Sequence, residues 1–123
     1  MKTVLAVSAI VLGLLQTASA QNQYSNWLYS GSIYILTSPA GANLPGSASE
    51  NNFPLLVRLN TDFFNFSQAK SDGSDVRFTT GAGTNLSYQI DEWNSAGGTA
   101  SIWVLVPTIK GNTNQQIIMY WGK

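Results

Sequence analysis

The residues best suited to chemistry lie within residues 71–93, in the stretch SDGSDVRFTTGAGTNLSYQIDEW. Asp72 and Asp75 flank a glycine and a serine there, and the adjacent acids Asp91 and Glu92 follow a glycine-rich loop. Acidic residues in loops bind calcium, and paired carboxyl groups hydrolyse glycosides. The same residue types also form the turns of a β-hairpin, so the spacing has to decide between these readings.

The spacing does not match a calcium loop of the EF-hand type. Such a loop needs acidic or amide ligands at positions 1, 3 and 5, Gly at 6 and Glu at 12. Counted from Asp72 as position 1, positions 5, 6 and 12 hold Val76, Arg77 and Gly83. We therefore predict no metal site, and a calcium site outside this pattern that uses Asp72 and Asp75 remains the alternative.

A turn and a hairpin explain the stretch instead. The carboxylate of an Asp-Gly turn can bond the backbone two residues on, and Asp75 is expected to cap the turn before the next strand. An odd-length loop lets Val76 and Phe78 share a face with Leu86. Its glycines accept positive φ angles, and Arg77 then lies opposite or diagonal to Gln89 and Asp91. The structural residues of this turn and hairpin are Asp72, Gly73, Asp75, Arg77, Gly81, Gly83 and Asp91.

No catalytic residue is predicted. Neighbouring residues on a strand point to opposite faces, so Asp91 and Glu92 do not form a glycosidase pair by themselves. The chain contains no His and no Cys, which excludes Ser-His-Asp triads, cysteine nucleophiles and zinc sites built from those ligands. Lys70 beside Ser71 is expected to be solvated in its turn. We expect a protein that is not an enzyme and uses no cofactor.

The first 20 residues have the pattern of a secretory signal peptide. Lys2 precedes the apolar run Val4 to Leu15, and Ala18-Ser19-Ala20 is a cleavage signature. The run is shorter than the ~20 residues that a membrane span needs. We expect residues 21–123 to be exported through the Sec pathway, to the cell surface or the medium, with the periplasm as the alternative.

The exported chain excludes two classes of partner. Without Lys2 the exported chain keeps five of the six basic residues and all six acidic residues, so its net charge is about −1. This charge offers no basic surface for nucleic acid. No later segment is apolar and long enough to insert into a membrane.

The fold class follows from short strands separated by turns. The expected strands are residues 32–36, 53–60, 75–80, 86–93, 99–107 and 115–122, and residues 38–52 form a long loop. No helix of useful length is expected, so the 103 residues predict a single all-β domain, an antiparallel β-sandwich of jelly-roll type. Without cysteine, packing alone must stabilise it.

Three of the strands are apolar on both faces, which is more than a two-sheet sandwich requires. Ser32, Ser101 and Gln116 are polar and are expected to face water. The residues at every second position from them are therefore assigned to the outer face. That set is Tyr34, Leu36, Trp103, Leu105, Ile118 and Tyr120. We expect these residues to form one surface on one sheet, either covered by a loop or free to contact a glycan, a neighbouring domain or a subunit.

Several segments together resemble a known family. FPLLVRLN, FNFSQAKSDGSDVRFTT, LSYQIDEWN, ASIWVLVPTIKG and IIMYWGK occur in the order and spacing of the bacterial domain of unknown function 2341, and the resemblance covers residues 27–123. It implies an exported β-sandwich module, often found beside laminin-G or concanavalin-like domains or in proteins associated with MotA/TolQ/ExbB-type components. It supplies no catalytic positions.

These observations predict a non-catalytic, exported binding or adhesion module with a carbohydrate ligand. The alternative is a structural subunit or interdomain packing unit of a bacterial cell-surface assembly, which includes self-assembly. Because the sequence stops directly after its last strand, we expect either the N-terminal module of a longer protein or a small secreted subunit.

Overall fold

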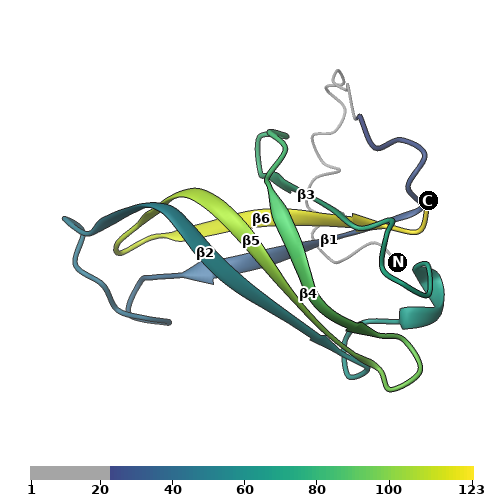
Figure 1. Ribbon diagram of the computed structural model, residues 1–123. Coiled ribbons are helices and arrows are strands. Elements are labelled where there is room, and N and C mark those ends of the chain that lie inside the picture. Colours follow the sequence, from purple (N-terminus) through teal and green to yellow (C-terminus); the bar gives the residue numbers. More distant parts are fainter. Residues whose placement is uncertain (1–22) are drawn as a thin grey trace.

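The protein is a sandwich of two antiparallel sheets in the computed structural model, which describes residues 23–123 (Figure 1). Its elements are β1 (Tyr29–Leu36), β2 (Ser49–Asn60), the 3-10 helix η2 (Phe66–Gln68), β3 (Arg77–Thr80), β4 (Tyr88–Asn94), β5 (Thr99–Lys110) and β6 (Asn114–Trp121). One sheet has the strand order β1-β6-β3 and the other β2-β5-β4. The predicted all-β antiparallel sandwich is confirmed. The predicted signal peptide lies outside the described residues.

The core is formed by alternate residues of the long strands. On β5, Ile102 and Val104 are fully buried, whereas their neighbours Trp103 and Leu105 face outward. On β6, Ile117 and Met119 are buried in the same way from the opposite sheet. Each buried aliphatic side chain contributes about 1.5–3 kcal/mol relative to exposure, so the two inward rows hold the sheets together.

The predicted hairpin of β3 and β4 forms only next to its turn. Thr79 and Asn85 make an isolated bridge, and the N–H of Leu86 donates to the carbonyl of Phe78 at 2.9 Å. After Leu86 the chain crosses to the other sheet, where β4 pairs with β5. The crossing places β4 beside β5, where Ile90 lies opposite the buried Ile102.

The loop between β1 and β2 closes one end of the sandwich. Thr37 is buried there, and its hydroxyl lies 2.6 Å from the carbonyl oxygen of Lys110 and accepts the N–H of Thr113 at 3.0 Å. The N–H of Gly111 also donates to the carbonyl of Ala48 at 2.9 Å. These contacts tie the loop to the β5–β6 turn, away from the outer faces of the sheets.

Candidate functional site

The outer face of the β2-β5-β4 sheet carries an exposed apolar strip. Trp103 and Leu105 of β5 are each 42% exposed. In the register, Trp103 lies between Leu56 of β2 and Gln89 of β4, and Leu105 lies beside Pro54. An exposed indole on a sheet surface, flanked by aliphatic and amide side chains, can stack against a planar or apolar ligand face.

A shallow hollow of about 260 Å³ adjoins Trp103 on this face. It is lined by Pro54, Ser87, Tyr88, Gln89, Trp103, Val104 and Leu105. Ser87 and Gln89 are exposed and two residues apart, so their side chains share a face. Their hydroxyl and amide groups can donate and accept hydrogen bonds next to the ring. Arg58 and Glu92 lie across from each other beside Ser101, one position further along the sheet.

The predicted single outer surface is wrong, because its residues are divided between the two sheets. Trp103 and Leu105 belong to β5, whereas Tyr34 and Leu36 of β1 are 54% and 40% exposed on the other sheet. Ile118 and Tyr120 of β6 share that second sheet and are half-buried. Phase along a strand separates inside from outside, but it does not reveal to which sheet a strand belongs.

A turn at residues 23–26 partly covers Tyr120. The rings of Tyr24 and Tyr120 lie 4.9 Å apart between centroids, and Tyr24 packs edge-on against Trp27 at 4.8 Å. This contact was not predicted from the sequence. The spacing of Tyr24 and Trp27 in a polar stretch was the available signal.

Trp27 links this turn to the residues before β3 and after β6. Its Nε1–H donates to the carbonyl of Asp75 at 2.6 Å. The guanidinium of Arg77 lies 5.6 Å from the centre of the Trp27 ring and the ammonium of Lys123 lies 4.9 Å from it, so both are placed for cation–π contact.

Asp75 is a buried anchor of the backbone. It is 3% exposed, and its Oδ1 accepts the N–H of Lys70 at 3.0 Å. Its Oδ2 accepts the N–H of Gly122 at 2.8 Å and that of Lys123 at 3.3 Å. Both carboxylate oxygens are therefore occupied by backbone donors that come from the turn before β3 and from the end of β6.

Asp72 lies in the same turn but is exposed. It accepts the N–H of Ser74 at 3.0 Å, and hydrogen bonds from the Ser74 side chain and backbone lower the pKa of Asp72 below its ordinary value of 3.8. Gly73 has φ +72°, and its Cα faces the ring of Trp93. Within residues 23–123, no three His, Cys, Asp or Glu side chains group together as a metal site would require.

Arg77 does not pair with Gln89 or Asp91 as predicted. Its cross-strand neighbour is Tyr120 of β6, because β3 lies in the sheet that excludes β4. The Arg77 guanidinium donates to the carbonyl of Val76 at 2.7 Å and to the hydroxyl of Tyr88 at 3.1 Å. It therefore bridges the two sheets through a neutral partner.

Two further predictions of local geometry need correction. Gly83 has φ +97°, as the hairpin loop requires, but Gly81 does not have a positive φ. Asp91 and Glu92 do not point to opposite faces. Both are exposed, because the register of β4 with β5 shifts between Ile90 and Glu92 in a β-bulge. The bulge lets Trp93 face inward only three residues after Ile90.

One comparison with known proteins gives a match, and this match covers the C-terminal part of the chain. The family model of a domain of unknown function, DUF2341, matches residues 72–123, which run from the Asp72 turn to the end of β6. Neither the curated proteins nor the solved structures give a significant match. No helix among residues 23–123 has the length and apolarity to cross a membrane. Residues 72–123 thus match the model of the DUF2341 family, which supports the resemblance that the sequence motifs indicated.

Proposed function

We propose that the protein is an exported, non-catalytic binding or adhesion module that binds carbohydrate on the outer face of the β2-β5-β4 sheet. The observation that carries this proposal is the exposed indole of Trp103 beside the hydrogen-bonding side chains of Ser87 and Gln89. The predicted signal peptide supports export to the cell surface or the medium.

The chemistry of the face suits a sugar. One face of a pyranose ring is largely C–H and can cover an aromatic ring, while its hydroxyl groups need donors and acceptors at the rim. Trp103 and Leu105 supply the apolar floor, and Ser87 and Gln89 supply the polar groups. The hollow beside Trp103 is shallow, so a polysaccharide chain could pass over it without entering a deep pocket. The lack of His and Cys supports binding over catalysis.

The test compares two exposed aromatic residues on opposite faces of the sandwich. The exported chain is screened on a glycan array, and hits are measured by calorimetry with the soluble oligosaccharide. Trp103→Ala should weaken binding at least about tenfold. Tyr34→Ala is the matched control, because Tyr34 is 54% exposed on the other sheet; it should leave the affinity within about twofold. An array without signal in every glycan class would refute the carbohydrate proposal.

A second candidate function is a structural subunit or packing unit of a cell-surface assembly. It is favoured by β1, an edge strand without charge or proline that exposes Tyr34 and Leu36. Size-exclusion chromatography with light scattering tests its self-associating form. A molar mass that grows with concentration supports the self-associating form. A protein that stays monomeric at every concentration weakens this form, and the packing unit would then dock to another chain.

A further inference from the structure

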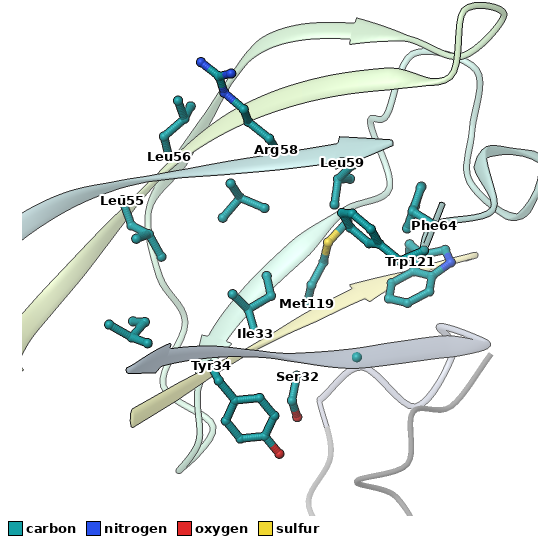
Figure 2. A pocket seen from close by; sticks show the side chains of 14 residues that line it. Ser32, Ile33, Tyr34, Leu55, Leu56, Arg58, Leu59, Phe64, Met119 and Trp121 are labelled. Carbon is teal, nitrogen blue, oxygen red and sulfur yellow. The ribbon is translucent and has the colours of Figure 1, made fainter. Parts of the chain in front are cut away.

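An apolar groove runs along one side of the sandwich, between β1 and β2. Its volume is about 560 Å³. Figure 2 shows Ile33, Leu55 and Leu59 turned into the groove, with Met119 at its floor. Leu56 and Tyr34, by contrast, point away from it (Figure 2). The groove exposes part of the sandwich interior, because Ile33, Ile35 and Leu55 are only partly buried and Phe63 at one end is 59% exposed.

Both walls of the groove are edge strands. Within residues 23–123, β1 pairs with β6 and β2 with β5, and neither has a neighbour on its other side. Alternate N–H and C=O groups along these edges therefore have no strand partner. Such an edge is a template for another strand unless the sequence protects it.

The two edges are protected differently. The β2 edge contains Pro54, the charged Arg58 and an interruption of the register at Asn52, which has φ 53°. Proline, charge and irregular residues are the means by which sheet edges resist pairing. The β1 sequence YSGSIYIL has none of them, and its register with β6 is unbroken over all eight residues. A strand that joins the sandwich on this side would therefore join β1.

The groove defines the side chains of such a strand. A strand beside β1 would direct every second side chain beneath β2, toward Leu55, Val57 and Leu59. The single charged residue of the lining is Arg58, and Figure 2 shows its guanidinium turned away from the groove. The inserted side chains must then be uncharged, because a charge placed there would lose its hydration without gaining a partner.

We propose that β1 accepts an extended segment of a different protein, not a second copy of this chain, as the fourth strand of its sheet, and that the alternate apolar side chains of this segment fill the groove. Residues 31–35 and 55–59 line the walls, so the groove matches about five residues of extended chain and two or three inserted side chains. The inference gives a partner class to the second candidate function and is independent of the Trp103 face.

A synthetic peptide of defined pattern tests the proposal. The probe is acetyl-Thr-Val-Thr-Val-Thr-Val-Thr-Lys-Lys-amide, in which the two lysines provide solubility. Its binding to the exported chain is measured by calorimetry, and hydrogen exchange locates the protected amides. We expect a Kd of roughly micromolar order and slower exchange along β1. A copy that is N-methylated at every central residue keeps the side chains but lacks the backbone N–H donors of those residues, and should not bind.

Two variants of neighbouring residues locate the site. Leu55→Glu places a carboxylate in the groove and should weaken binding at least about tenfold, whereas Leu56→Glu on the opposite face of β2 should change it less than about twofold. If Leu55→Glu does not fold, the methylated peptide still decides the result. Trp103→Ala should leave peptide binding unchanged, which separates this test from that of carbohydrate binding.

Three results would overturn the proposal. The first is no binding of the alternating peptide at about 1 mM. The second is equal binding of the methylated copy, which would indicate an apolar site that does not recognise a strand. The third is a concentration-dependent dimer whose β1 amides are protected without peptide, because a second copy of this chain would then occupy the edge.

Discussion

The carboxylate of Asp75 accepts the backbone N–H of Gly122 at 2.8 Å and thereby joins the turn before β3 to the end of β6. The same side chain accepts the N–H groups of Lys70 and Lys123. Asp75→Ala should lower the free energy of unfolding by about 3 kcal/mol, because buried N–H groups lose a charged acceptor. Asp75→Asn keeps one acceptor oxygen, so it should lower the free energy of unfolding by a smaller amount. Urea denaturation of both variants measures the difference.

Asp72→Ala is the control for this experiment. Asp72 is exposed and bonds only within its own turn, so Asp72→Ala should lower the free energy of unfolding much less than Asp75→Ala. Added calcium should alter neither result. A calcium-dependent rise in the melting temperature that Asp75→Ala abolishes would contradict the structural role and point to a metal site.

The pKa of Asp72 should respond to Ser74. Hydrogen bonds from the Ser74 side chain and backbone lower this pKa below 3.8, so Ser74→Ala should raise it by removing the side-chain bond. Since the folded-state pKa is lowered, the associated stabilisation is present above the unfolded pKa and is lost as the pH falls through the folded value. An NMR titration of the Asp72 carboxyl carbon in the unchanged protein and in Ser74→Ala gives the two pKa values to compare. An identical pKa in the two proteins would contradict the assignment.

Three glycines should separate backbone strain from steric clash. Gly73 has φ +72°, and an added Cβ would lie 2.4 Å from the Trp93 ring. Gly83 has φ +97° but open space, and Gly46 has neither constraint. Substitution by Ala should cost about 2–4 kcal/mol at Gly73, about 1 kcal/mol at Gly83 and almost nothing at Gly46. Thermal unfolding of the three variants gives this order, and an equal loss at Gly73 and Gly83 would remove the clash from the explanation.

Thr37 should matter more than its neighbour Ser38. The buried Thr37 hydroxyl connects the β1–β2 loop to the backbone of Lys110 and Thr113. Thr37→Val keeps the shape but leaves the N–H of Thr113 without its side-chain acceptor, and should cost about 1–3 kcal/mol. Ser38→Ala removes an exposed bond to Asn114 and should have little effect. Equal denaturation midpoints for the two variants would contradict this role of Thr37.

The sequence was sufficient to predict the sandwich because its strand signals are local. Alternation within β5 correctly placed Ile102 and Val104 inside and Trp103 outside. The assignment of strands to sheets depends instead on contacts between distant segments. Periodicity therefore could not show that Trp103 and Tyr34 lie on opposite faces of the molecule, and one expected surface became two.

Irregular backbone explains the other differences. The bulge at Asp91 breaks the alternation that separated this residue from Glu92, and no residue type in the sequence marks it. The groove between β1 and β2 was also not predicted, because it arises where two sheets end on the same side. Such features depend on how elements meet, which a single sequence does not encode in a short pattern.

Trp103 gives the sharpest test of the proposed binding face. Because its side chain is 42% exposed, Trp103→Ala should lower the free energy of unfolding by only about 1–1.5 kcal/mol. Ile102 is the adjacent residue on the same strand and is fully buried, so Ile102→Ala should cost about 2–5 kcal/mol through the cavity that it leaves. Chemical denaturation of the two variants makes the comparison within one element. If Trp103→Ala were as destabilising as Ile102→Ala while glycan binding stayed unchanged, Trp103 would act as a packing residue, and the outer face of the β2-β5-β4 sheet would lose the group on which the proposed carbohydrate site depends.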